Sequence, residues 1–247
     1  MKKYLCFLAI SLSTASVFAE GTPNYWSGHV SAGLGWSSVN NNDMVNVGGT
    51  TAKQYATSNN TSNQPIFGLG IAYNIPYPDV LLGIGLSAYY MHNTNVTGTN
   101  TPYADGQPFS GSSLAYSANG QSYALMLEPK FTWTRYALQP YVFVGAGLAI
   151  NAFGNYAEWA TDPNGTATPA LYFPTSYDAY NLAYEMGAGV QYVIGKSPHA
   201  PTIGLDYRFM NWGSAQLAAN SQQDTGEGVN FGNIRTSSMN LTLSMPF

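Results

Sequence analysis

Charge, cysteine and long apolar runs are all scarce in this chain of 247 residues. Only 8% of its residues are Asp, Glu, Lys or Arg, against roughly 25% in an ordinary globular protein. A helix-rich soluble protein needs such residues on its solvated faces, so that class is excluded. No stretch reaches the roughly 18 consecutive apolar residues of a membrane-spanning helix. The net charge of −4 excludes a basic nucleic-acid binder, so no nucleic-acid partner is expected.

Aromatic residues and glycine are abundant instead. Phe, Trp and Tyr make up 14% of the chain, with 19 Tyr, and there are 26 Gly. This aromatic and aliphatic content is too high for a disordered chain, because disordered segments have few aromatic and β-branched residues. The composition therefore indicates a β-rich protein whose surface is not mainly exposed to water.

The first residues resemble a secretory signal. Two lysines precede a short apolar stretch that ends in small residues, which is the pattern of a cleaved signal peptide. An N-terminal membrane anchor is the poorer alternative, because the apolar stretch is short and polar residues follow it. Cleavage between Ala19 and Glu20 would remove Cys6, the only cysteine, so no disulfide and no cysteine metal site is expected. We predict a signal peptide over 1–19 and a single membrane domain over 20–247.

Apolar and small residues alternate along eight segments of the mature chain. A period of two is that of a β-strand, in which successive side chains point to opposite faces. One face carries Val, Leu, Ile and aromatic residues, and the other carries mainly Gly, Ala and Ser. The predicted strands are residues 25–37, 65–75, 80–90, 122–133, 141–151, 180–192, 203–210 and 238–247.

The connections between these strands alternate between long and short. The long ones are 39–64, 92–120, 152–178 and 213–233, and they are rich in Asn, Thr and Ser. This regularity is typical of outer-membrane barrels, which have short periplasmic turns and long extracellular loops. The predicted fold is all-β: an eight-stranded antiparallel up-and-down transmembrane β-barrel with four long extracellular loops and three short periplasmic turns.

A soluble β-sandwich also alternates, but it would place charged residues on its outer face. Here the residues on the face without large apolar side chains are mostly small and uncharged, unlike those of a water-exposed surface. Small residues do suit the interior of a narrow barrel. Closure is also required, because an open sheet edge in lipid leaves backbone groups unpaired. Aromatic residues at the strand ends are expected to form two interfacial girdles. The periplasmic girdle is Trp26, Tyr73, Trp133, Tyr192 and Phe247, and the outer girdle is Trp36, Phe67, Tyr90, Tyr123, Tyr180 and Phe209.

Gly-x-Gly pairs on successive strands, and the segments 181–190 and 205–209, resemble the family of OmpA-like and opacity-like eight-stranded outer-membrane barrels. The last strand resembles the C-terminal signal of that class, through Met239, Leu241, Leu243, Met245 and Phe247. The resemblance implies an outer-membrane location in a Gram-negative bacterium, contact with outer-membrane lipid and lipopolysaccharide, and recognition of Phe247 by the barrel-assembly machinery. The chain stops at the last strand, so the peptidoglycan-binding domain of larger relatives is not implied.

Five charged residues fall on the face that points away from lipid. They are Glu128, Lys130, Glu185, Asp206 and Arg208. Burial in a narrow lumen favours mutual neutralisation of such groups. We therefore predict a luminal network of salt bridges with Arg208 at its centre, since a guanidinium can serve two carboxylates at once. Such a network would block or gate the lumen; the alternative is a set of separately hydrated side chains.

The sequence contains no convincing set of catalytic residues. The histidines His29, His92 and His199 are scattered, and no catalytic residue, cofactor site or metal site is predicted. The expected function is non-enzymatic: a structural or surface-recognition role through the long loops, whose ligand is a host or surface molecule. A narrow channel for small or apolar solutes is the alternative, and a lipid-modifying enzyme is a minor one. Aromatic residues of the loops fit either a binding surface or simple loop packing.

Overall fold

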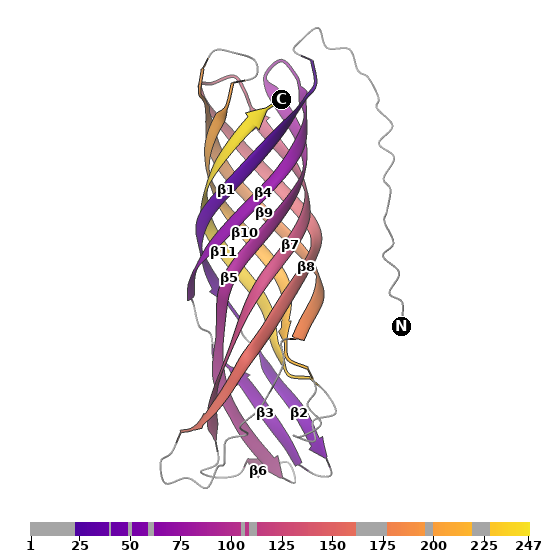
Figure 1. Ribbon diagram of the computed structural model, residues 1–247, viewed down its shortest axis with the longest axis vertical. Helices are drawn as coiled ribbons and strands as arrows, with labels where there is room; N and C mark the ends of the chain where they lie inside the picture. The colour runs from indigo at the N-terminus through magenta and orange to yellow at the C-terminus, as the bar shows by residue number, and fades with distance from the viewer. Residues whose placement is uncertain are drawn as a thin grey trace, which may run out of the picture.

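The computed structural model describes residues 23–39, 41–48, 51–58, 62–104, 107–108, 113–161, 177–195, 200–218 and 228–247. They form one antiparallel sheet (Figure 1). Its strands are β1 (Tyr25–Ser38), β2 (Asn42–Gly48), β3 (Thr51–Thr57), β4 (Ser62–Pro76), β5 (Val80–Ala104), β6 (Gln107–Pro108), β7 (Leu114–Trp133), β8 (Leu138–Ala160), β9 (Tyr177–Val193), β10 (Thr202–Gln216) and β11 (Asn230–Pro246). No helix among the described residues is long and apolar enough to span a membrane.

Eight of these strands close into a barrel. The pairing runs β1–β4–β5–β7–β8–β9–β10–β11 and returns to β1, where Ser27 is paired with Pro246 and Ser38 with Arg235. The strands are tilted steeply around a long cylinder (Figure 1). Closure leaves no free edge in the spanning part, which satisfies the backbone in lipid. The predicted eight-stranded up-and-down barrel is confirmed.

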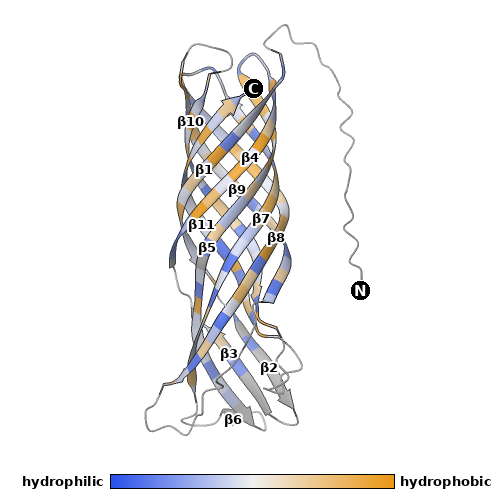
Figure 2. Cartoon of the chain, in the orientation of Figure 1, coloured by the Kyte–Doolittle hydropathy of each residue, from blue (hydrophilic) through white to orange (hydrophobic). Residues whose placement is uncertain are grey.

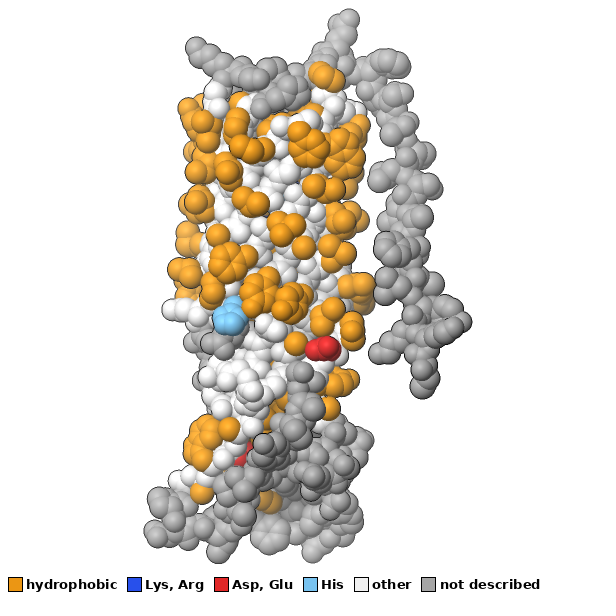
Figure 3. Space-filling model, in the orientation of Figure 1, with side chains coloured by type: hydrophobic (Ala, Val, Ile, Leu, Met, Phe, Trp, Pro, Cys, Tyr) orange, Lys and Arg blue, Asp and Glu red, His pale blue; other side chains and the backbone are white. Residues whose placement is uncertain are grey.

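The outward face of the barrel is apolar over most of its height. Leu69, Leu148 and Leu182 are exposed to 63%, 64% and 80%. Figure 3 shows hydrophobic side chains spread over the upper part of the cylinder, and Figure 2 shows hydrophobic and hydrophilic residues interspersed along the strands of this part. Among the described residues, no Lys, Arg, Asp or Glu side chain faces outward between the two aromatic girdles. This band is therefore the surface that lipid covers.

Aromatic residues mark both borders of this band. At the turn end, Trp26 lies 5.2 Å from Tyr73 between ring centroids. At the loop end, strand register places Phe67 beside Tyr90, and Tyr90 beside Tyr123 at 5.1 Å. Trp and Tyr rings are favourable at a membrane interface because they are apolar with one polar edge.

The long connections contain more strand than the sequence indicated. Residues 39–64, predicted as a loop, include β2 and β3. β5 continues to Ala104, β7 begins at Leu114, and β8 continues to Ala160. Three barrel strands and the β2–β3 hairpin thus form a loop-end extension, in which β3 pairs with the outer part of β5. Beyond the lipid, the outward face need not be apolar, so the alternation that identified the other strands is weak here.

Aromatic rings pack against one another inside the loop-end extension. Tyr116 is fully buried and lies 5.8 Å from Tyr55, 5.6 Å from Tyr156 and 5.5 Å from Phe231 between ring centroids. Aromatic pairs at these distances add roughly 0.5–1.5 kcal/mol each beyond area burial. The extension is therefore a packed structure, and Tyr116 is the centre of its aromatic cluster.

Candidate functional site

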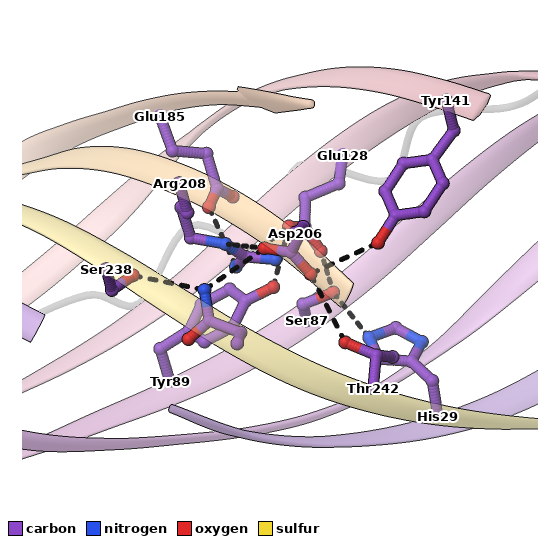
Figure 4. A network of polar contacts seen from close by, with 11 residues as sticks. His29, Ser87, Tyr89, Glu128, Tyr141, Glu185, Asp206, Arg208, Ser238 and Thr242 are labelled. Atoms are coloured by element: carbon purple, nitrogen blue, oxygen red, sulfur yellow. Dashed lines mark hydrogen bonds and ion pairs between the residues drawn. The ribbon is translucent and has the colours of Figure 1, made fainter. Parts of the chain in front are cut away.

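A cluster of charged residues crosses the lumen of the barrel (Figure 4). Arg208 on β10 projects inward and lies 2.9 Å from Glu185 on β9, 3.4 Å from Glu128 on β7 and 3.7 Å from Asp206 on its own strand. The guanidinium also lies over the rings of Tyr89 and Phe143, with its Cζ 4.4 and 4.6 Å from the ring centroids. One cation therefore contacts three carboxylates from three strands of the wall. We call these four residues, Arg208, Glu128, Glu185 and Asp206, the Arg208 cluster.

Neutral donors satisfy two of these carboxylates further. Glu128 accepts hydrogen bonds from Tyr89, at 2.7 Å, and from Ser87. Asp206 accepts from Asn240 at 3.0 Å, Tyr141 at 3.2 Å and Thr242 at 3.4 Å. Buried carboxylates require such partners, because an isolated charge in the interior is costly. The sequence alone could not identify these hydroxyl and amide donors. Alternation predicts which face of the sheet a residue lies on, but not which residues of other strands it contacts.

Glycine makes room for the cluster on two strands. A Cβ atom on Gly145 would meet the Glu185 carboxylate, and one on Gly187 would meet the Phe143 ring. Both glycines belong to the Gly-x-Gly pairs of the sequence. Their role in this structure is to provide space inside the barrel.

Lys130 does not join the Arg208 cluster by an ion pair. Among the described residues, its ammonium forms no salt bridge within 4.0 Å. It donates to Gln191 Oε1 at 2.8 Å, and Nζ lies 3.8 Å from the ring centroid of Tyr141. Gln191 donates in turn to Gln139 at 3.1 Å. Of the five charged residues predicted for the network, the structure thus brings four together and places Lys130 beside them with neutral partners.

An apolar plug fills the lumen on the loop-end side of the cluster. Glu185 is paired with Met210 in the sheet, and beyond this level the inward side chains are fully buried and mostly apolar. Trp212 is completely buried, and its Nε1 donates to Thr236 at 3.1 Å. This packing continues into the aromatic cluster of the extension. The plug contains Ile66, Met91, Ala124, Met126, Ala149, Ala183, Met210, Trp212 and Ile234.

A cavity of about 360 Å³ occupies the lumen on the other side of the cluster. Its walls run from the turn segments near Pro78 and Gln139 to Glu128, Asp206 and Arg208. We call it the vestibule. The described residues therefore divide the barrel along its axis into a vestibule, a charged partition and a plug.

The last strand is paired along its length on both sides. Leu241 and Leu243 are bonded in register to β1 and β10, and they face outward with Met239, Met245 and Phe247. Phe247 is 75% exposed, and its backbone N–H donates to Trp26 O at 2.8 Å. The predicted assembly signal thus has its side chains on the lipid-facing surface. The predicted signal peptide, with its cleavage site at Ala19 and Glu20, lies outside the described residues.

The family described as outer membrane protein beta-barrel domain matches residues 5–247. The chain belongs to this family. Its membership confirms the outer-membrane location and the barrel class expected from the sequence. The turn end of this outer-membrane barrel is accordingly its periplasmic end, and the loop end faces outward.

Solved outer-membrane proteins resemble the chain at low sequence identity. Neisserial surface protein A is 12% identical, covers 92% of this chain and 100% of its own, and has a TM-score of 0.45. The outer membrane protease OmpT from Escherichia coli is 9% identical, covers 92% and 99%, and has a TM-score of 0.48. Ail, the attachment invasion locus protein of Yersinia pestis, is 16% identical, covers 90% and 99%, and has a TM-score of 0.36. No curated protein sequence matches the chain.

Two groups of this outer-membrane barrel have residue types used in catalysis. His29 Nε2 lies 3.1 Å from Ser87 Oγ, which contacts Glu128, a juxtaposition that the spacing of the sequence did not indicate. The acid bonds the serine and not the imidazole, so the order of groups differs from that of a nucleophilic triad. At the outer interface, His92 bonds Tyr90 at 2.8 Å. Asp178 is three strands away from His92, or about 14 Å at the usual strand spacing.

The outer end of the barrel presents a few exposed rings on a rigid framework. Trp159 on β8 is 48% exposed, and Tyr177 at the start of β9 is 39% exposed. In contrast, Tyr116 and Tyr156 are buried in the aromatic cluster. The aromatic residues of the long connections that the structure describes therefore divide into core residues and surface residues.

Proposed function

We propose that this outer-membrane barrel is a non-enzymatic surface-recognition protein that binds through its loop-end extension. The observation that carries the proposal is the packed aromatic cluster around Tyr116, which joins β3, β7, β8 and β11. Strand pairing adds β2 and the outer part of β5 to this folded unit. A prefolded surface loses little conformational entropy when it binds, which favours affinity.

The chemistry of the extension favours a neutral or weakly charged ligand. Trp159 and Tyr177 offer flat apolar faces with polar edges, the kind of side chain that dominates binding energy at interfaces. The surrounding chain is rich in Asn, Thr and Ser and poor in charge. Stacking and hydrogen bonding to a carbohydrate or to a protein surface are the interactions that this surface supports.

The filled lumen favours this proposal over the alternative of a channel for solutes. A solute that entered the vestibule would meet the Arg208 cluster and then the buried ring of Trp212. An eight-stranded barrel has an interior just wide enough for its own side chains. We expect the purified barrel to be silent in planar bilayers. Stable open-channel steps would instead favour a solute channel.

The test of recognition compares paired aromatic variants on intact cells. A glycan array and a panel of extracellular-matrix proteins serve as probes for cells that display the wild-type barrel. Trp159→Ala combined with Tyr177→Ala is expected to weaken the binding observed by about tenfold or more, since truncating a hot-spot ring costs at least about 2 kcal/mol. Tyr136→Ala is the matched control, because Tyr136 is 61% exposed at the opposite end.

Surface amounts of the three proteins are equalised by gel analysis of the folded form. Undiminished binding by the double variant would contradict the proposed surface, and failure of the wild type to bind any probe above empty cells would contradict recognition by this extension. A catalytic alternative is tested separately by incubating the purified barrel with lipid and peptide substrates. Hydrolysis or acyl transfer would show an enzyme activity, independently of the result of the binding assay.

A further inference from the structure

The vestibule differs from the rest of the lumen in being an unfilled space, lined by both apolar and polar residues. Its volume of about 360 Å³ lies within the range of small-molecule pockets. Near the periplasmic opening the lining is mixed: Leu81 and Val193 are apolar, whereas Asn74 and Gln139 are polar. Deeper, it includes the ammonium of Lys130 and then the Arg208 cluster. A small molecule with an apolar part and one charged group can contact both kinds of residue.

The charged groups that face the vestibule differ in the hydrogen-bonding capacity that remains to them. Glu128 and Asp206 are occupied by Arg208 and by hydroxyl and amide donors. Lys130 has three N–H donors, and the described residues provide one hydrogen-bond acceptor, Gln191. Lys130 also lies nearer to the periplasmic opening than Glu128, by two residues along β7. An entering molecule therefore meets an ammonium group with spare donors before it reaches the carboxylates.

We propose that the vestibule is a binding site for a small amphiphilic carboxylate, entered from the periplasmic end. The carboxylate accepts hydrogen bonds from Lys130 Nζ, and the apolar part lies along Leu81 and Val193. The Tyr141 ring and Gln191 hold the ammonium in place from the other side. The site lies at the opposite end of the barrel from the proposed recognition surface and does not depend on it.

Three probes of the same size distinguish charge recognition from simple partitioning. They are trifluoromethyl-labelled hexanoate, hexanamide and hexylamine, measured by fluorine NMR with the barrel in nanodiscs of zwitterionic lipid. Empty nanodiscs correct for uptake into lipid. The hexanoate is expected to bind about tenfold or more tightly than the amide, because charge-assisted hydrogen bonds are the stronger kind. The hexylamine is expected to bind more weakly than either.

Two variants test the site by different routes. Lys130→Met removes the ammonium and retains an unbranched chain, so the preference for hexanoate over hexanamide should disappear. Gly83→Val keeps every charge but narrows the vestibule, because a Cβ on Gly83 would lie 3.2 Å from Asn74 and 3.8 Å from Lys130, where only modest adjustment is needed. It should weaken hexanoate and hexanamide alike. Arg135→Gln is the control, an exposed cation at the same end, and should leave all affinities unchanged.

Each variant is first checked for the heat-modifiable gel mobility of a folded barrel, and Gly83→Val remains informative if Lys130→Met does not fold. Tighter binding of hexylamine than of hexanoate would overturn the proposal. Equal binding of all three probes, hexanoate binding unchanged by Lys130→Met or Gly83→Val, or no binding of hexanoate to the wild type would overturn it as well.

Discussion

Removal of the Arg208 guanidinium is the sharpest perturbation of the spanning part of the barrel. The side chain is 8% exposed, and three carboxylates lie within 3.7 Å of it. Arg208→Met removes all three ion pairs and the contacts of the guanidinium with the Tyr89 and Phe143 rings, and retains an unbranched apolar side chain. Glu128 and Asp206 retain neutral donors, whereas Glu185 loses its 2.9 Å partner.

The expected loss follows from the charge that remains buried. Breaking a buried ion pair by removing one partner costs about 3–5 kcal/mol, because the other partner stays buried without compensation. We expect Arg208→Met to lower the free energy of unfolding by this amount at neutral pH. Adding Glu185→Gln removes the least compensated carboxylate, so the double variant should regain part of the loss, about 1–2 kcal/mol.

The measurement is urea unfolding of the barrel folded into phospholipid vesicles, followed by tryptophan fluorescence and by gel mobility. Trp212 lies in the plug and reports on this level of the lumen. Arg235→Met is the control, because Arg235 is an exposed arginine beyond the lipid band and its loss should cost no more than about 0.5 kcal/mol. An unfolding midpoint for Arg208→Met equal to that of the control would refute the reasoning.

Three further results are expected. Phe247→Ser should reduce the amount of assembled barrel and increase periplasmic degradation, while the free energy of unfolding of the folded protein falls by only about 1–3 kcal/mol. Normal levels of the variant in the outer-membrane fraction would contradict recognition of Phe247 during assembly. The barrel should migrate as a compact form on gels until it is boiled, and equal mobility before and after boiling would argue against a closed barrel. Burial raises the pKa of Tyr116 from 10.0 to about 12. The stability that the neutral Tyr116 contributes is therefore complete below pH 10 and is lost as the pH rises through about 12. Limited proteolysis of the extension across this pH range measures the loss, and Tyr116→Phe should show no such increase in cleavage.

The spanning strands could be predicted because lipid imposes a strict pattern on them. Outward positions such as Leu69 and Leu182 must be apolar, so a period of two also assigns Glu185 and Arg208 to the lumen. The same pattern failed for β2 and β3. These strands lie beyond the lipid, where an outward Asn or Thr is as acceptable as Leu, and their inward residues include the buried Tyr55.

Partners across the lumen could not be predicted, for a different reason. Alternation says that Lys130 and Asp206 share the inner face, but their distance depends on strand tilt and on the stagger between β7 and β10. Lys130 consequently pairs with Gln191, a neutral residue, although carboxylates are nearby. The contact between His29 and Ser87, which lie 58 residues apart on strands that are not direct neighbours, has the same origin.

The seam between β1 and β11 has a consequence for how the molecule is made. Ser27 is paired with Pro246, so the first and last strands of the chain must meet before the cylinder exists. The edges of β1 and β11 stay open until these two strands pair, and an open edge is a template for pairing with other chains. Non-local pairing of this kind is also slow, because the entropy of closing a long loop is lost before the contacts form. Closure of the barrel therefore depends on the pairing of two strands that are far apart in the sequence.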